Sequence, residues 1–123
     1  MLQKLEHIGV MVSDMARSID FYTRVLGLEL REKRSLGGGV ELAFLGLGGA
    51  ELELVSGAPA PVAGDAQVNH IAFAVESLPV AMQSIHDIDA AITFTEPMLL
   101  WDGKGCVFFR GPDGERLELF GRL

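Results

Sequence analysis

The feature that most constrains this chain is an internal repeat. The segments His7–Val12 (HIGVMV) and His70–Val75 (HIAFAV) both begin with a histidine that is followed by apolar residues. A glutamate follows each histidine at a similar distance: Glu53 lies 46 residues after the first, and Glu118 lies 48 residues after the second. Two matches in the same order and at nearly equal spacing predict two copies of one structural unit.

The closing part of each copy also aligns. Residues 44–54 (FLGLGGAELEL) align with residues 109–119 (FRGPDGERLEL), which pairs Phe44 with Phe109. Each stretch carries glycines ahead of a Leu-Glu-Leu run, as expected for a turn between the last two strands of a unit. The repeat therefore extends to the end of each copy.

Each copy is expected to form a strand, a helix and three further strands. Ser13 or Asp14 is suited to cap the first helix, and Gly27 stands where a helix end favours a positive φ. Between them, apolar residues recur at steps of three and four, which gives the helix one apolar stripe. The expected elements of the first copy are a strand at 5–12, a helix at 14–26 and strands at 28–34, 40–46 and 50–56.

The second copy follows the same plan. Ser77 is suited to cap its helix, and Pro79 stands in the first turn, where its missing N–H is not needed. The expected elements are a strand at 68–75, a helix at 78–88 and strands at 91–95, 105–110 and 115–120. The organisation we expect is a first module at 1–56, a small-residue and proline linker at 57–69 and a second module at 70–123, within one compact domain.

Composition narrows the function. The chain of 123 residues has a formal net charge of −7, which disfavours binding to nucleic acid or to acidic membranes. Its apolar runs are shorter than the roughly 18 residues of a membrane span. The single cysteine, Cys106, cannot form an internal disulfide, which fits a reducing cytoplasm. We therefore expect a cytoplasmic protein whose partner is a small molecule.

Four polar residues stand out on the expected strands, where side chains alternate between two faces. One face of each strand is aliphatic and can pack under a helix, whereas the other carries one histidine or glutamate among small or apolar neighbours. An isolated buried carboxylate is costly unless it is paired or bound to a metal. Two imidazoles and two carboxylates predict a site for one divalent transition metal: Ni, Co, Zn, Fe or Mn. The predicted ligands are His7, Glu53, His70 and Glu118.

These stretches resemble the vicinal-oxygen-chelate superfamily, the group of glyoxalase I, bleomycin-resistance proteins and extradiol dioxygenases. The resemblance rests on HIGVMVSDMARSIDFYTRVLGLEL, AELELV, NHIAFAV and GPDGERLELF, which together span nearly the whole chain. It implies an α+β fold in which two βαβββ modules form a curved mixed sheet that holds a metal in its cup. Within the superfamily, bacterial glyoxalase I is the most similar in its metal-ligand set, and its ligands fall on His7, Glu53, His70 and Glu118.

The resemblance implies a metal-dependent lyase or isomerase of glyoxalase type. Such an enzyme acts through a metal-bound enediolate on a small oxygenated substrate, for example a thiol adduct of methylglyoxal. A carboxylate must take the carbon-bound proton and return it to the adjacent carbon. Glu118 and Glu53 are the candidates for this base, and Glu118 is favoured.

Two positions depart from the glyoxalase pattern. Bacterial glyoxalase I has an arginine four residues after its first histidine and an asparagine four residues after its first glutamate, and both help to hold glutathione. This chain has Met11 and Gly57 there. Two alternatives therefore stay open: an enzyme like methylmalonyl-CoA epimerase or another enolising enzyme on the same metal site, and a non-catalytic module that binds a small ligand.

Further residues are candidates for contact with the substrate. Met11, Phe44, Leu99 and Phe120 are suited to form apolar walls, and Trp101 to line the cup. Polar contacts are considered for Glu51, Arg110 and Glu115, whereas Cys106 is expected in a strand core and His86 on an exposed helix face. Because a single module leaves its sheet open at an edge, modules must pair, and we expect a homodimer.

Overall fold

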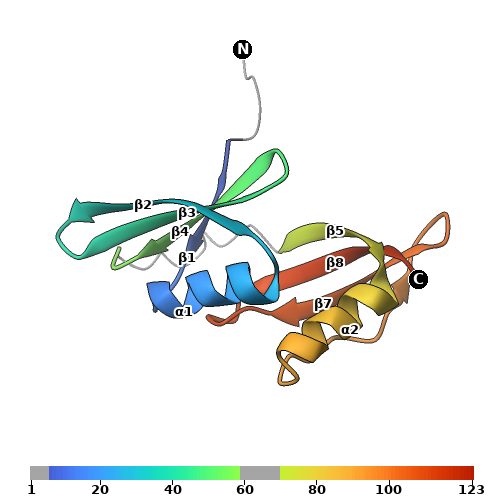
Figure 1. Ribbon diagram of the computed structural model, residues 1–123. Helices are drawn as coiled ribbons and strands as arrows, with labels where there is room; N and C mark the ends of the chain where they lie inside the picture. Colours follow the sequence, from blue (N-terminus) through green and yellow to red (C-terminus); the bar gives the residue numbers. More distant parts are fainter. Residues whose placement is uncertain (1–5, 59–69) are drawn as a thin grey trace, which may run out of the picture. The chain divides into compact units, whose positions relative to one another are not determined.

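The computed structural model describes residues 6–58 and 70–123 (Figure 1). The chain divides into two compact units, Met1–Val62 and Ala63–Leu123, and each contains one four-stranded mixed sheet. We call their described parts the first and the second module. This architecture confirms the predicted α+β fold of two βαβββ modules. Most of the expected linker, residues 59–69, lies outside the described residues.

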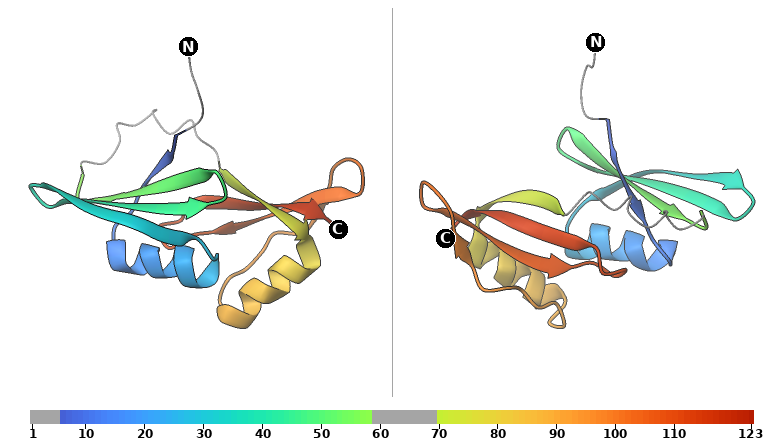
Figure 2. Two further views of the ribbon diagram at one scale, coloured as in Figure 1. Left: turned by 45° about the horizontal axis from the view of Figure 1, so that its top comes forward. Right: turned by 180° about the vertical axis from the view of Figure 1, so that it is seen from behind.

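The first module forms a sheet in the order β1-β4-β3-β2. Strand β1 runs parallel to β4, and the other pairs are antiparallel. The helical segment α1 covers one face of this sheet (Figure 2). The elements are β1 (Ile8–Met11), α1 (Met15–Asp20), a π-helical turn η1 (Phe21–Val25), β2 (Glu29–Gly37), β3 (Val40–Leu47) and β4 (Ala50–Ser56).

Local interactions set the limits of the first helical segment. The side chain of Asp14 accepts a hydrogen bond from the backbone N–H of Arg17 at 3.0 Å, so Asp14 is the N-cap. At the other end, Gly27 adopts φ +79°, a conformation that glycine takes without strain. The backbone N–H of Leu28 then bonds to the carbonyl of Tyr22 at 2.9 Å and leads the chain into β2.

The second module repeats this topology with the order β5-β8-β7-β6, in which β5 runs parallel to β8. Ser77 caps its helix by accepting a hydrogen bond from the N–H of Val80 at 3.5 Å. The elements are β5 (Ile71–Ser77), α2 (Leu78–Ile88), β6 (Met98–Leu99), β7 (Lys104–Arg110) and β8 (Arg116–Arg122). Among the residues placed in either module, no helix is both long and apolar enough to cross a membrane.

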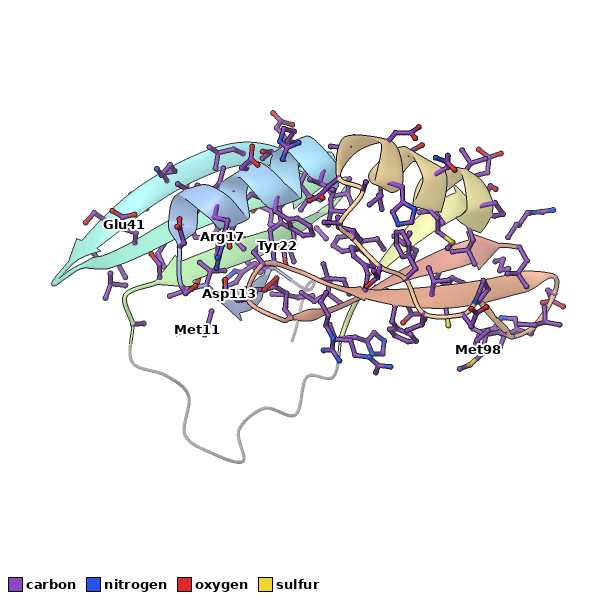
Figure 3. The ribbon with its side chains drawn as sticks, turned by 90° about the horizontal axis from the view of Figure 1, so that it is seen from below. Met11, Arg17, Tyr22, Glu41, Met98 and Asp113 are labelled. Atoms are coloured by element: carbon purple, nitrogen blue, oxygen red, sulfur yellow. The ribbon has the colours of Figure 1, made fainter. Side chains whose placement is uncertain are left out.

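Each module has its own apolar core between sheet and helix. In the first, Tyr22, Leu45 and Leu54 are fully buried, and Tyr22 lies between the helical segment and the strands (Figure 3). In the second, Leu117 and Val107 are equally buried. Burial of a large aliphatic side chain contributes about 1.5–3 kcal/mol. The core faces are those that strand alternation predicted, which leaves the opposite face of each sheet for the polar residues.

One predicted strand is wrong. Residues 91–95 form no strand, and the second strand of the second module is β6, which has 2 residues against 9 in its counterpart β2. Thr95 gives the reason: its N–H bonds to the carbonyl of Phe108, but the N–H of Phe108 bonds to the Thr95 hydroxyl, both at 2.9 Å. Because a side chain replaces a backbone acceptor, the strand ladder does not continue through this segment.

The alignment of Phe44 with Phe109 is also wrong, by one residue. In the first module Phe44 lies opposite Glu53, and in the second Phe108 lies opposite Glu118. The turn between β7 and β8 is longer than the two-glycine turn between β3 and β4, so the alignment needs its gap there. Phe109 is a buried core residue on the other face of its strand.

Candidate functional site

The first module brings His7 and Glu53 together on the sheet face opposite its helix. The imidazole Nε2 of His7 lies 3.3 Å from Oε2 of Glu53, and the two side chains are 37% and 19% exposed. The ring of Phe44 meets the edge of His7, with ring centroids 6.0 Å apart. Strand register explains the cluster, because Glu53 lies between Gly9 on β1 and Phe44 on β3.

The second module contains the same cluster. Nε2 of His70 lies 2.8 Å from Oε2 of Glu118, and the ring centroids of His70 and Phe108 are 5.5 Å apart, again edge to face. Glu118 lies between Ala72 on β5 and Phe108 on β7, which matches the register of Glu53. The repeat seen in the sequence is therefore a repeat of geometry, in which each module holds one imidazole against one carboxylate beside one phenyl ring.

Glu118 is the more enclosed of the two carboxylates. The whole residue is 8% exposed, although a charged side chain this deeply buried is uncommon unless it has a partner. Cys106 hydrogen-bonds to this carboxylate, and burial, followed by the negative charge of Glu118, raises the pKa of the Cys106 thiol. Cys106 is buried as expected, but on the face of Glu118 rather than in the apolar core.

Most of the other residues predicted to contact the substrate lie outside the two histidine–glutamate clusters. Met11 is 40% exposed and extends from β1 on the side away from α1 (Figure 3). Phe120 neighbours Cys106 across the β7–β8 ladder, and its ring lies 5.9 Å from that of Trp101. Trp101 is itself 61% exposed, so it is not a core residue. Phe44 is the predicted wall residue with a direct contact to a candidate ligand.

His86 differs from the expectation of an exposed side chain. It is half-buried, its Nε2 lies within hydrogen-bond distance of the Ile92 carbonyl, and its ring contacts Phe94 at 5.1 Å between centroids. The sequence gives no signal for this role, because the segment that His86 contacts was expected to be a strand.

Phe108 and Arg116 are site residues that sequence reasoning missed. The guanidinium carbon of Arg116 lies 3.8 Å from the centre of the Phe108 ring. Alternation along 105–110 and a gap placed in the turn would have identified Phe108 as the counterpart of Phe44.

Each module by itself offers two donors to an ion. Within either module, among residues 6–58 and 70–123, no three side chains of histidine, cysteine, aspartate or glutamate gather closely enough to hold a metal. A tetrahedral site needs four ligands, or three and a water. The donor pair of one module alone is therefore too small for such a site.

Known sequences are similar over almost the full chain. Residues 4–119 match the family described as the Glyoxalase/Bleomycin resistance protein/Dioxygenase superfamily. The uncharacterized protein YwbC of Bacillus subtilis (strain 168) is 33% identical, covering 99% of this chain and 100% of that protein. Mitochondrial methylmalonyl-CoA epimerase of Bos taurus is 30% identical, covering 91% and 69%. Lactoylglutathione lyase of Escherichia coli O157:H7 is 32% identical, covering 94% and 90%.

Solved structures share the fold. The crystal structure of SMU.1112c superposes with a TM-score of 0.81 at 27% identity, covering 98% of this chain and 99% of that one. TnmS3, an antibiotic-binding protein from Streptomyces sp. CB03234, has a TM-score of 0.77 at 18% identity, covering 99% and 98%. Proteins of this fold thus include one that is described by binding rather than by catalysis.

Proposed function

The chain belongs to the Glyoxalase/Bleomycin resistance protein/Dioxygenase superfamily, and from this premise we propose that it is a metal-dependent lyase or isomerase of glyoxalase type. Its metal ligands in this proposal are His7, Glu53, His70 and Glu118, and its substrate is a small oxygenated molecule. The superfamily contains enzymes, among them the lyase and the epimerase to which this chain is similar.

The observation that carries the proposal is the repeated cluster. A lone histidine beside a glutamate is common on protein surfaces and indicates little. Here the Nε2–Oε2 contact occurs twice, at 3.3 Å and 2.8 Å, in the same strand register and beside a phenyl ring each time. Fold stability does not require this polar pattern on the sheet face opposite the helix, so its presence in both modules favours a shared role.

The residues present fit a divalent transition metal. Imidazole nitrogen and carboxylate oxygen are borderline and hard donors, the types that Zn, Ni, Co, Fe and Mn accept. Glu118 is a buried carboxylate that contacts His70 and Cys106, and such a group is costly without a strong partner.

When bound, the metal would supply Lewis-acid stabilisation of the negative charge that develops as the substrate loses a carbon-bound proton. The proton transfer itself falls to this chain. We assign the base to Glu118, because its enclosure by Phe108, Cys106 and Phe120 limits access of water to the carboxylate. The carboxylate takes the proton from one carbon and returns it to the neighbouring one. Glu53, which is more exposed, would serve as a ligand.

Gly57 bears on the identity of the substrate, because the glutathione-binding pattern has an asparagine at this position. A Cβ at this position would lie 2.1 Å from the carbonyl oxygen of Gly39, and Gly57 has φ +75°. An asparagine, which the glutathione-binding pattern has here, would need the backbone to move. Met11 likewise offers no charge for a glutathione carboxylate. These two positions favour a substrate other than a glutathione adduct, and they make an epimerase-like or other enolising enzyme the second candidate.

Metal content tests the enzyme proposal against the binding-module alternative. We expect elemental analysis of the purified chain, and of chain refolded with Ni, Co, Zn or Mn, to give one metal ion per chain. A His70→Ala variant should lose most of this metal, whereas the His86→Ala variant, a matched control whose histidine belongs to neither cluster, should retain it. Absence of stoichiometric metal under every condition would overturn both enzyme readings.

Substrate assays then separate the two enzyme candidates. The hemithioacetal of methylglyoxal with glutathione tests whether the lyase uses glutathione, and a chiral acyl thioester with an acidic α-hydrogen tests the epimerase. We expect weak or no turnover of the glutathione adduct. Full activity with it would show that neither Met11 nor Gly57 excludes glutathione.

A further inference from the structure

We infer that the second module carries a binding site for an oxyanion group, a carboxylate or a phosphate, at the end of β7 and β8 next to their connecting turn. A pocket of about 270 Å³ lies there, with Arg110, Arg116, Thr93 and Thr95 among its lining residues and Phe108 in its wall. Its volume is slightly below the range of about 300–1,000 Å³ for whole-ligand pockets, which suits one small charged group.

The pocket exists because β6, the second strand of the module, is short. The segment ahead of β6 follows the edge of β7 through the two hydrogen bonds between Thr95 and Phe108, without becoming a strand. Contacts hold this segment in place: Phe94 packs on Phe109 with ring centroids 5.3 Å apart, and His86 contacts both Phe94 and the Ile92 carbonyl. One wall of the pocket is therefore fixed by specific contacts.

The polar groups that line the pocket are donors of hydrogen bonds. A guanidinium group has five N–H donors in one plane, and it pairs with carboxylate and phosphate in a bidentate manner. Arg116 is stacked on the Phe108 ring, which orders its guanidinium group. The hydroxyl oxygen of Thr95 accepts the N–H of Phe108, so the hydroxyl hydrogen remains available to an acceptor. Arg110 donates one N–H to the Gly114 carbonyl at 3.2 Å and has others left.

The charge of this pocket is opposite in sign to the net charge of the protein. The protein carries a net charge of −7, yet two arginines line this one small pocket and no acidic residue does. The nearest acid along the turn, Glu115, is half-buried, and its Oε1 accepts the N–H of Asp113 at 3.4 Å. An anion here would be stabilised by both guanidinium groups.

The first module lacks this arrangement, although its fold is the same. The positions equivalent to Arg110 and Arg116 are Gly46 and Glu51, which lie opposite each other in the β3–β4 ladder. Arg31 lies over Gly46 and pairs with Glu51 at 3.5 Å, so a carboxylate occupies the corresponding place in the first module. The oxyanion site is thus a property of the second module alone.

Phe108 links this site to the candidate ligands. One ring contacts both His70, at 5.5 Å between centroids, and Arg116, at 3.8 Å. A bound anion would lie one aromatic ring away from the His70–Glu118 pair. The further statement that the substrate itself carries a carboxylate or phosphate group rests on the proposed function, whereas the anion site does not.

Titration with simple anions tests the site directly. Amide NMR spectra of the full chain as purified would be followed while sodium phosphate or sodium acetate replaces chloride at constant ionic strength. We expect saturable shifts confined to residues 93–95, 108–110 and 116, with the probe that binds more tightly identifying the preferred group. Shifts that stay linear with concentration, or that spread over all basic residues, would overturn the inference.

Matched variants sharpen this titration. Arg116→Gln should weaken anion binding about tenfold, the effect of one charge-assisted hydrogen bond. Arg122→Gln removes the same charge from the far end of the same strand and should leave binding unchanged. Equal affinities for Arg116→Gln and the parent chain would remove Arg116 from the site. Because the titration needs no catalysis, a failure of the metal analysis and a failure of anion binding are separate results.

Discussion

The two modules have the same arrangement of site residues in the middle of their sheets, but their outer strands differ in length. In each, one row across three strands holds a small residue (Gly9 or Ala72), a glutamate and a phenylalanine at the same register, and a histidine stands two residues before the small one. At the outer edge, however, the first module has a strand of 9 residues and the second a strand of 2. Near the turn, an arginine–glutamate pair in the first corresponds to two arginines in the second.

This difference fits two separate requirements, one for binding a metal and one for binding a substrate. A metal that takes its ligands from both modules requires the same row in both. A substrate that is not symmetric requires different surroundings on the two sides. A shared row with different edges would suit the metal-dependent enzyme that we propose, acting on an asymmetric substrate.

The largest expected effect comes from the paired carboxylates. Glu118→Gln should reduce kcat by about 10²–10⁴-fold with the substrate that the assays identify, since it removes the proposed base. Glu53→Gln should cost less in kcat and more in metal content, because Glu53 is proposed as a ligand alone. Turnover and metal stoichiometry would be measured on both variants. Equal losses of turnover in the two variants would contradict the assignment of Glu118 as the base and Glu53 as a ligand alone.

An intermediate effect is expected at the residue four positions after each glutamate. Gly57→Ala should lower the free energy of unfolding by about 1–3 kcal/mol, because the new Cβ would meet the Gly39 carbonyl at a positive φ. Its counterpart Arg122 is exposed, so Arg122→Ala should change stability by less than about 0.5 kcal/mol. Urea unfolding measures both. A neutral Gly57→Ala would show that the β2–β3 turn yields easily.

The smallest effect concerns the helices. In the first module, hydrogen bonds from Arg24 lower the pKa of Asp20, and the two side chains form an exposed ion pair at 3.0 Å. In the second module, the equivalent contact is a 2.8 Å hydrogen bond from the neutral Gln83 to Asp87.

Asp20→Asn should therefore lower the Tm slightly at neutral pH. A carboxyl group whose folded pKa is lowered stabilises above its unfolded pKa of about 3.9, and this contribution is lost as the pH falls through the folded pKa. The Tm values of Asp20→Asn and the parent chain should converge below about pH 4. Salt at 1 M should shrink the Asp20→Asn difference more than that of Gln83→Ala. A difference that persists in acid would point to packing rather than charge.

Local patterns predicted much of the fold. The cap at Asp14, the positive φ of Gly27 and the buried face of each strand follow from steric rules that act over a few residues. The prediction of a strand at 91–95 was wrong because the Thr95 side chain and the contacts of His86 set the position of this segment, and alternation of residue types does not encode such contacts. The pairing of Phe44 with Phe109 failed because turn length is decided by backbone geometry that identical residue types do not encode.

The candidate site was predicted by residue type but not by surroundings. The repeat identified the two histidines and two glutamates, and the structure brings each histidine to its own glutamate. The joint four-ligand site, the homodimer and the cytoplasmic location stay predictions. The pocket that we propose for an anion could not be predicted from the sequence, since it depends on the short length of β6.

Strand β2 has a consequence for how the protein behaves at high concentration. It is the edge of its sheet and is exposed along its whole length, and such an edge can template growth of aggregates. Five of its 9 residues are charged (Glu29, Arg31, Glu32, Lys33 and Arg34), and its ladder with β3 is interrupted by two irregularities. Natural sheets use charges and bulges on their edge strands to prevent edge-to-edge pairing with other copies. The charges and irregularities of β2 should therefore limit aggregation through this edge.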